Sequence, residues 1–378
     1  MSLSGRGLKS ILQKNLTDVV ILSSLRTPIT RAKKGAFKDA YPEELLSAVL
    51  KATLAANPNL DPAKIDDVAV GYMLAFIQQP ASAQSTDNVA QDWPPLQWWQ
   101  TARNYGSRAI PTVLWPELRD SDNGDARACI MPMGITSENV AERYGISRND
   151  QDAFAANSHV NASKAQKDGL FDDEIVPVTT TWLDPDAPEQ PGKVIKVDRD
   201  DGIRQNASLE GMRKLKPAFK EDGSSTAGNS SQISDGAAAT LLIRRSVAIE
   251  LGLSSSILGK WVATQTIGCH PDEMGVGPAV AIPRLLDVTG LQTKEVGIWE
   301  INEAFASQAL YCIRKLGIPE EKVNPKGGAI ALGHPLGATG ARQLATLLSE
   351  LARQGQDVGI VSMCVGTGMG MASMFVRE

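Results

Sequence analysis

NPKGGAIALGHPLGATG (residues 324–340) and SMCVGTGMG (residues 362–370) are two glycine-rich stretches that each present one reactive side chain. The first holds the imidazole of His334, and the second holds the thiol of Cys364. Glycines let a backbone approach a ligand closely, and loops on a rigid scaffold often carry function. The pair predicts acid and base chemistry on a substrate the size of a thioester.

The composition is that of an enzyme-sized globular chain. Of its 378 residues, 42% are hydrophobic and 21% charged, which is enough for one large core or two ordinary ones. The net charge of −5 and the lack of a dense basic run argue against a nucleic-acid-binding protein. No apolar stretch of the sequence approaches the length of a membrane span.

The four cysteines are widely spaced and include no CxxC pair; they are Cys129, Cys269, Cys312 and Cys364. This usage fits a reducing compartment and predicts neither a disulfide framework nor a metal site. Each thiol is therefore expected either to pack or to take part in chemistry. Cys312 lies on the apolar side of a predicted helix, and we assign it to packing.

Residues 1–17 are interpreted as a tail or a targeting segment. They contain three basic residues and no acidic one, and Leu8, Ile11 and Leu12 have helical spacing. That basic amphipathic character is typical of organellar targeting segments. A frayed, solvated tail is the alternative.

Strand and helix patterns alternate along the chain. Strands are predicted at residues 19–24, 68–70, 174–178, 241–243, 261–266, 295–299, 359–363 and 372–376. Helices are predicted around the stripe Leu46, Val49, Leu50 and Leu54, from a capping box at Ser147 toward Gly169, over 279–286 and 303–316, and around Leu344, Leu347, Leu348 and Leu351. Residues 184–192 are expected to form a surface loop. This alternation predicts a layered α/β protein with two similar halves.

One segment, residues 73–100, departs from the pattern. It reads MLAFIQQPASAQSTDNVAQDWPPLQWWQ and follows neither a period of 2 nor one of 3.6. Three tryptophans lie close together in it: Trp93, Trp98 and Trp99. A long surface loop is the alternative, but loops of this length without structure are uncommon inside compact domains.

The chain resembles the thiolases, most closely the peroxisomal-type 3-ketoacyl-CoA thiolases. The resemblance rests on NEAF at residues 302–305 and on the His334 and Cys364 loops, which occur in thiolase order. It extends to VILSSLRTPI (20–29), MGITSENVA (133–141), AGNSSQISDGA (227–237) and MGVGP (274–278). It implies the α/β thiolase fold, with two similar halves in α-β-α-β-α layers and a loop domain. We expect the N-terminal half to be incomplete.

The resemblance implies catalytic roles for four residues. His334 would activate a nucleophile, and Cys364 would move the proton at the acetyl α-carbon. Asn302 would position a water that forms one oxyanion site with His334, and the backbone N–H of Gly366 would contribute to a second.

The resemblance also implies the ligands and partners. Ser231 would contact CoA, and Met133 and Phe305 would be pocket walls. CoA would be a co-substrate, acyl-CoA and CoA would be the small-molecule partners, and neither a cofactor nor a metal is expected. A homodimer or tetramer is expected.

The sequence departs from the family at the nucleophile. Thiolases carry an NRQCSSG-like stretch before the motif that begins here at Met133, and its cysteine lies at a helix N-terminus, where its pKa is lowered. This chain has no such stretch, and Cys129, the nearest cysteine, belongs to the segment leading into Met133. The nucleophilic cysteine segment is therefore missing or replaced.

The expected function is thiolysis of 3-ketoacyl-CoA by CoA in fatty-acid β-oxidation, in the peroxisome or alternatively the mitochondrion. The absent nucleophile leaves alternatives open. They are a catalytically silent CoA-binding relative or dimer partner, the product of a faulty gene model, and an enzyme with Cys364 itself as nucleophile. Expected domains are 1–17, an N-terminal half at 18–250 with a loop domain at 132–227, and a C-terminal half at 251–378.

Each site residue also has a structural alternative. His334 could be a hydrogen-bonded turn residue, Cys364 a buried small hydrophobe, and Asn302 a helix N-cap. The family motifs favour function for His334 and Cys364. His159 lies on a polar helix and is expected to be solvated.

Overall fold

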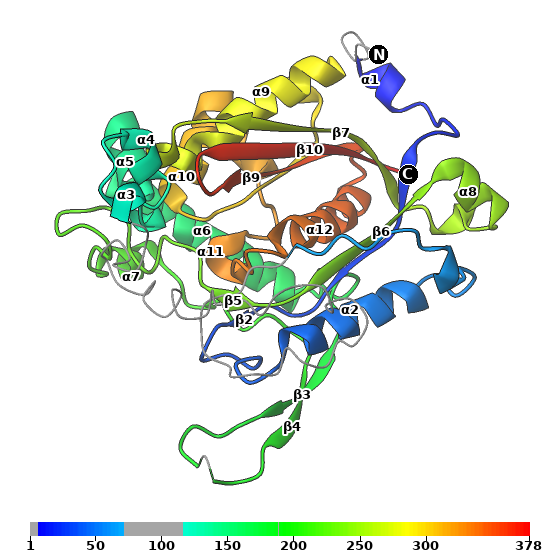
Figure 1. Cartoon of the computed structure of the whole chain (residues 1–378), viewed down its shortest axis with the longest axis horizontal. Helices are drawn as coiled ribbons and strands as arrows, with labels where there is room; N and C mark the ends of the chain where they lie inside the picture. The colour runs from blue at the N-terminus through cyan, green and yellow to red at the C-terminus, as the bar shows by residue number, and fades with distance from the viewer. Residues whose placement is uncertain (1–6, 72–115, 188) are drawn as a thin grey trace.

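The computed structural model describes residues 7–71, 116–187 and 189–378, with strands and helices alternating along the chain (Figure 1). The anomalous stretch 73–100 lies outside the described residues. The strands are β1 (Val19–Arg26), β2 (Thr30–Arg31), β3 (Val178–Trp182), β4 (Lys193–Val197), β5 (Ser234–Asp235), β6 (Ala238–Arg244), β7 (Gly259–Gly268), β8 (Ile298–Ile301), β9 (Val358–Val365) and β10 (Met369–Arg377). The α-helices are α1 (Gly7–Ile11), α2 (Pro42–Ala55), α3 (Pro116–Arg119), α4 (Gly124–Ala128), α5 (Met133–Tyr144), α6 (Arg148–Lys167), α7 (Leu209–Arg213), α8 (Arg245–Glu250), α9 (Gly277–Thr289), α10 (Ala306–Leu316), α11 (Ala329–Leu332) and α12 (Thr339–Gln354).

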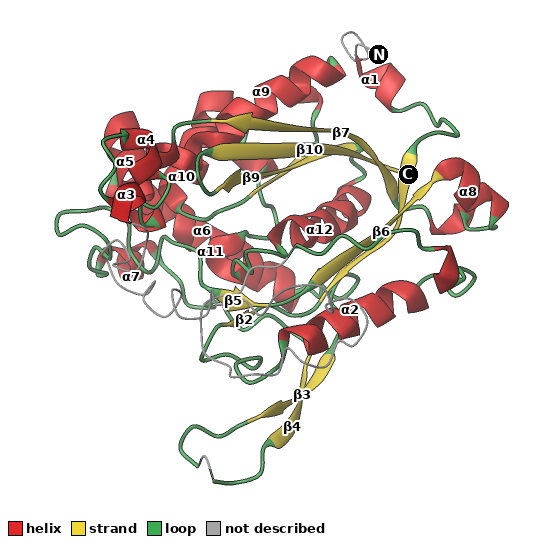
Figure 2. Ribbon diagram, in the orientation of Figure 1, coloured by secondary structure: helices red, strands yellow, loops and turns green. Residues whose placement is uncertain are grey.

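A six-stranded curled sheet forms the frame of the molecule, in the order β6-β1-β7-β10-β9-β8 (Figure 2). Its neighbours pair antiparallel except β8 and β9, which are parallel. The part of the chain up to residue 250 supplies β1 and β6, and the part after residue 250 supplies the other four strands. β1 joins the two halves through a short ladder in which Val19 pairs with Trp261.

Helices cover both faces of this sheet around β9 and β10, where strand residues are buried on both sides. On one face, α12 packs Leu344, Leu347, Leu348 and Leu351 against Val361 and Phe375. On the other face, α9 packs Ile282 and Leu285 against Ile360 and Met374. Consecutive strand residues, such as Ile360 and Val361, thus enter opposite cores, as the period of 2 requires. The layered α/β prediction is confirmed.

Between β1 and β6 the chain leaves the sheet to form α5, α6, α7 and the β3–β4 hairpin, which extends away from the other elements (Figure 1). The predicted start of α6 is confirmed, because the Ser147 hydroxyl accepts a hydrogen bond from the N–H of Asp150. The loop predicted at 184–192 connects β3 to β4. No helix in the described ranges combines the length and apolarity that crossing a bilayer would need.

Two strand predictions are wrong. Residues 68–70 form no strand, and Val68 and Val70 are 60% and 53% exposed. These valines pair with none of the described strands, and β1 has β6 and β7 as its neighbours. Over 174–178, Ile175 makes only an isolated bridge to Arg26, and the strand starts at Val178, after Pro177, which has no backbone N–H to donate.

Three other elements are displaced from their predicted positions. β8 starts at Ile298 because a single 3₁₀ turn, Thr293–Glu295, precedes it. α10 starts at Ala306, since the backbone before it pairs with the 229–231 segment. In α2 the buried face is Leu45, Val49 and Thr53, one position away from most of the predicted stripe.

The described part of the N-terminal segment is docked on the body. α1 places Ile11, 3% exposed, against the core cluster on the α9 side of the sheet. Leu8 and Leu12 pack against the same cluster, as their helical spacing allows. The chain therefore enters β1 from a helix that is anchored to the core.

Candidate functional site

The loop that carries His334 is held in a backbone conformation that favours glycine. Gly333, which follows α11, has φ +108°, and an added Cβ would lie 2.2 Å from Oγ of Ser234. The N–H of His334 donates to the carbonyl oxygen of Gln232 at 3.0 Å. These restraints place the imidazole beside the end of β8.

Both ring nitrogens of His334 have hydrogen-bond partners. Nδ1 lies 2.7 Å from Oγ1 of Thr339, and Nε2 lies 3.3 Å from Nδ2 of Asn302. Burial of the ring, reinforced by the guanidinium of Arg342, lowers the pKa of His334 to about 4. The imidazole is therefore neutral at physiological pH and can accept a proton.

Asn302 is fixed at the end of β8 by its backbone. Its N–H donates to the carbonyl oxygen of Ser362 at 2.9 Å, and its own carbonyl oxygen accepts from Gln308 at 2.7 Å. The N-cap of α10 is Phe305, so the capping alternative for Asn302 is wrong. Its Oδ1 is buried and has no hydrogen-bond partner among the described residues, which leaves an acceptor free beside His334.

Cys364 lies near the end of β9 and pairs with Gly370 of β10 across a tight turn. The residue is half-buried, and desolvation of the sulfur raises the pKa of the Cys364 thiol to about 12, with Cys269 nearby adding to the shift. The thiol is therefore protonated at neutral pH. In the turn itself, an added Cβ at Gly366 would meet no atom within 4 Å, so the backbone there is open to an approaching molecule.

The three predicted ligand contacts lie on segments that come together near the Phe219 ring. The ring of Phe305 packs edge-on against Phe219, with 5.9 Å between centroids. A Cβ on Gly134, next to Met133, would lie 2.1 Å from the Phe219 ring. Ser231 is tied to this corner because its N–H donates to the carbonyl oxygen of Ala304 at 3.0 Å.

Beside this corner is a surface cavity of about 380 Å³. The residues that line it are Arg204, Gln205, Asn206, Ala207, Ser208, Gly211, Met212 and Leu215. Met212 and Leu215 also lie against Gly228, three residues before Ser231. The cavity therefore borders the loop that was predicted to contact CoA.

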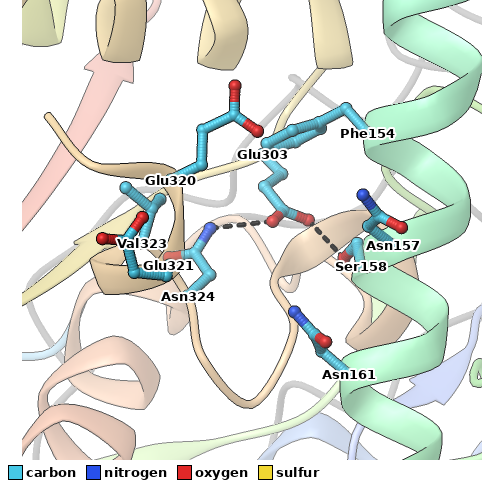
Figure 3. A pocket seen from close by; sticks show the side chains of 9 residues that line it. All are labelled: Phe154, Asn157, Ser158, Asn161, Glu303, Glu320, Glu321, Val323 and Asn324. Atoms are coloured by element: carbon cyan, nitrogen blue, oxygen red, sulfur yellow. Dashed lines mark hydrogen bonds between the residues drawn. The ribbon is translucent and has the colours of Figure 1, made fainter. Parts of the chain in front are cut away.

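A second cavity, of about 210 Å³, lies between α6 and the turn Glu320–Lys322 (Figure 3). At its floor the Glu303 carboxylate accepts from Ser158 at 2.7 Å and from Asn324 at 2.8 Å, and both contacts are drawn in Figure 3. Burial raises the pKa of Glu303, and these hydrogen bonds oppose that rise. The hydrogen bonds of Glu303 thus attach the segment that contains Asn302 both to α6 and to the start of the His334 loop.

Several contacts of the site were not identified from the sequence. Thr339, Phe219 and Gln308 each touch a predicted site residue. The only sequence signal for Thr339 is a hydroxyl five positions after His334, which also suits a helix start. The packing prediction for Cys312 is confirmed, since it is 0% exposed.

The prediction that His159 is solvated is wrong. His159 is 1% exposed on α6, because this helix is covered on several sides and not on one. Its Nδ1 accepts a hydrogen bond from the N–H of Arg204 at 3.2 Å. Burial, together with the charge of Arg204, lowers the pKa of His159 to about 4.

The cysteine positions bear on the missing nucleophile. No cysteine precedes Cys129 in the sequence, and Cys129 lies at the C-terminal end of α4. Desolvation raises the pKa of Cys269 to about 11, and burial likewise raises the pKa of the Cys312 thiol. Across residues 7–71, 116–187 and 189–378, no group of three His, Cys, Asp or Glu side chains could hold a metal ion.

Two family profiles together match most of the chain. "Thiolase, C-terminal domain" matches residues 255–377, and "Thiolase, N-terminal domain" matches residues 19–91 and 123–246. The interval between the two matched parts of the N-terminal domain, 92–122, overlaps the end of the anomalous stretch 73–100 and extends beyond it.

Relatives of known name match almost the whole length. The peroxisomal 3-ketoacyl-CoA thiolase B of Rattus norvegicus is 49% identical over 398 residues, covering 96% of this chain and 92% of the relative. The peroxisomal 3-ketoacyl-CoA thiolase of Homo sapiens is 48% identical with the same coverage.

Two solved structures have the same fold. The dimeric peroxisomal thiolase of Saccharomyces cerevisiae has a TM-score of 0.80 and 42% identity, covering 98% of this chain and 100% of that one. The human mitochondrial 3-ketoacyl-CoA thiolase in complex with CoA has a TM-score of 0.76 and 27% identity, covering 96% and 98%.

Proposed function

The chain belongs to the thiolase family, and from this premise we propose that it is an acetyl-CoA acyltransferase that cleaves 3-ketoacyl-CoA with CoA. The observation that carries the proposal is the contact of Asn302 with His334, beside the strand that carries Cys364. Relatives near 49% identity over 96% of the chain bear the name peroxisomal 3-ketoacyl-CoA thiolase. The activity belongs to peroxisomal fatty-acid β-oxidation.

The reaction breaks the Cα–Cβ bond of the 3-ketoacyl thioester and forms a bond between the CoA sulfur and the β-carbonyl carbon. The electron pair of the broken bond stays on the acetyl α-carbon, which must take up a proton. Cys364, held as a neutral thiol, is suited to give that proton. His334, held as a neutral imidazole, is suited to take the proton of an attacking thiol.

Hydrogen-bond donors are needed where the thioester and ketone oxygens gain negative charge. The amide of Asn302 lies beside His334, and the open backbone at Gly366 lies in the Cys364 turn. Three residues around Phe219 are proposed to hold the CoA chain at the edge of the 380 Å³ cavity, namely Ser231, Met133 and Phe305. CoA serves as co-substrate, and neither a cofactor nor a metal is part of the proposal.

The chain is proposed to act as a homodimer, since the Saccharomyces cerevisiae relative is described as dimeric. A tetramer is the other outcome of a mass measurement in solution. Light scattering of the purified chain separates the two states.

A second candidate function is CoA binding without turnover. The observation that favours it is the absence of any cysteine before Cys129, because the family's acyl-carrying cysteine has no counterpart there. The test measures thiolysis of short- and long-chain 3-ketoacyl-CoA by the wild type, by Cys364→Ala and by Cys269→Ala. The last variant is the matched control, since Cys269 is also a half-buried thiol of raised pKa.

Turnover that is lost in Cys364→Ala and kept in Cys269→Ala supports the acyltransferase. Mass spectrometry of the quenched wild-type enzyme then shows which residue carries the acyl group. Binding of acyl-CoA in calorimetry without turnover selects the second candidate, and a folded chain that neither binds nor reacts refutes both.

A further inference from the structure

We propose that Thr339 is a positioning residue that fixes His334 in the tautomer protonated at Nδ1, so that Nε2 keeps its lone pair toward the site. The catalytic meaning of this inference rests on the proposed function. The tautomer itself is a property of the folded chain and can be measured without turnover.

The hydrogen-bond donors and acceptors at Thr339 determine the direction of its bond to His334. Its Oγ1 lies 3.0 Å from the carbonyl oxygen of Pro335 and 2.7 Å from Nδ1 of His334. A carbonyl oxygen can only accept, so the single hydroxyl proton points at Pro335. The short contact to Nδ1 is then a bond in which the ring N–H donates and Oγ1 accepts.

The opposite side of the ring gives the same assignment independently. The amide nitrogen of Asn302, 3.3 Å from Nε2, is a donor, and a donor needs the unprotonated form of Nε2. The reverse arrangement would have Thr339 donate to Nδ1 and Nε2–H donate to the Asn302 oxygen. It would lose the Thr339 bond to the carbonyl oxygen of Pro335, which also accepts the backbone N–H of Ala338 at 2.7 Å.

The burial of Thr339 stabilises its hydrogen bonds. Thr339 is 0% exposed, so water does not compete for its hydroxyl, and hydrogen bonds are stronger in such surroundings. Thr339 is also the first residue of the long helix α12, which packs into the core and limits the movement of the side chain. When Nε2 takes a proton during the reaction, Nδ1–H keeps its acceptor, so the ring does not have to turn.

The chain contains a built-in comparison, because His159 has the opposite hydrogen-bond arrangement. Its Nδ1 accepts from the N–H of Arg204, so its proton must lie on Nε2. The sequence has only three histidines, and the third, His270, has a largely exposed side chain. Their signals can therefore be assigned with His159→Gln and His270→Gln.

The experiment is nitrogen NMR of the full chain labelled with ¹⁵N-histidine, at neutral pH. We expect His334 to show a protonated Nδ1 and an unprotonated Nε2, and His159 to show the reverse. In Thr339→Val, which keeps the shape but removes the hydroxyl, the His334 pattern should change to a mixture or to Nε2–H. Thr339→Ser should restore the wild-type pattern.

Thr346→Val is the matched control. Thr346 is a buried threonine on the same helix whose hydroxyl donates to Glu174 at 2.9 Å and does not touch His334. It should leave the His334 tautomer unchanged, even though it also loses a buried hydroxyl. In thiolysis, Thr339→Val should lower kcat by about tenfold to a hundredfold with little change in KM, less than the roughly 10²–10⁴-fold that a general base contributes, because His334 itself remains.

Three outcomes overturn the proposal. They are an Nε2–H tautomer of His334 in the wild type, an unchanged tautomer in Thr339→Val, and an equal change in Thr346→Val. If the wild type shows the expected tautomer and Thr339→Val alters it, but no variant turns over substrate, the proposed function fails while the role of Thr339 in setting the ring stands.

Discussion

The backbone N–H of Asn302 donates to the carbonyl oxygen of Ser362 at 2.9 Å, two residues before Cys364. The side chain of the same Asn302 contacts Nε2 of His334. Asn302 is therefore the residue at which the His334 loop and the Cys364 strand meet. A substitution at Asn302 should therefore affect the His334 imidazole first, because the Asn302 side chain contacts it directly.

Asn302→Asp should raise the pKa of His334 from about 4 by about one to three units. The reason is that a carboxylate would replace a neutral amide 3.3 Å from Nε2 and favour the imidazolium. The measurement is a ¹⁵N-histidine NMR titration of wild type and variant. Asn302→Ala, which removes the amide without adding charge, is the control, and an equal rise in both variants would contradict the electrostatic explanation.

The sequence was sufficient to predict the site residues that lie in contiguous motifs, and insufficient for their contacts. His334 and Cys364 stand on glycine-rich bends that are visible in the sequence itself. The hydroxyl of Thr339 gives no comparable signal, since a threonine at a helix start is ordinary.

Burial was the harder property to predict. His159 looked solvated because its own helix is polar, but the covering residues come from the segment around Arg204. Val68 and Val70 looked like a strand, but a ladder needs a partner strand elsewhere in the chain, and these residues pair with none of the described strands. Both errors arise where the deciding partner is distant in sequence.

Cys364 should react slowly with iodoacetamide at neutral pH, because the thiolate is the reactive form and burial raises the pKa of this thiol to about 12. Its alkylation rate should rise about tenfold for each pH unit up to about pH 9. Half-exposed Cys129 should be labelled before it. Peptide mass spectrometry at timed intervals measures all four cysteines, and Cys312, fully buried, should stay unlabelled longest.

The opposite order of cysteine labelling would change the role assigned to Cys364. Labelling of Cys364 as fast as that of Cys129 would indicate a thiolate at neutral pH. That result would favour the alternative in which Cys364 is itself the nucleophile with His334 as its base.

Arg26→Met should destabilise the chain by about 3–5 kcal/mol, the usual cost of removing one partner from a buried ion pair. Arg26 donates to both oxygens of Asp200, at 2.8 and 3.0 Å, and to Glu174 at 2.7 Å, and all three residues are buried. Burial alone would raise the pKa of Glu174, but Arg26 and Lys326 hold it at about 2. Urea unfolding of wild type and variant gives the difference.

Arg119→Met is the control for that measurement. Its ion pair with Asp120 lies at the surface, where substitutions away from the core usually change stability little. Equal losses in the two variants would show that the buried pair contributes no more than an exposed one.

His159→Gln should flatten the pH dependence of stability between about pH 6.5 and 4. The folded pKa of His159 is about 4, below its ordinary value, so in this range the unfolded chain binds the extra proton. The free energy of unfolding of the wild type therefore falls as pH falls, by up to about 1.4 kcal/mol per pH unit from this residue. Urea unfolding of wild type and variant at a series of pH values across this range measures the two profiles.

The comparison must be made as a difference between variant and wild type, because other buried groups act with the opposite sign. Burial raises the pKa of Glu300 to about 8 and that of Asp235 to about 6, so the folded chain binds their protons first. Both contributions cancel when the His159→Gln profile is subtracted from that of the wild type. A profile for His159→Gln that runs parallel to that of the wild type would show that the buried ring does not titrate as its environment requires.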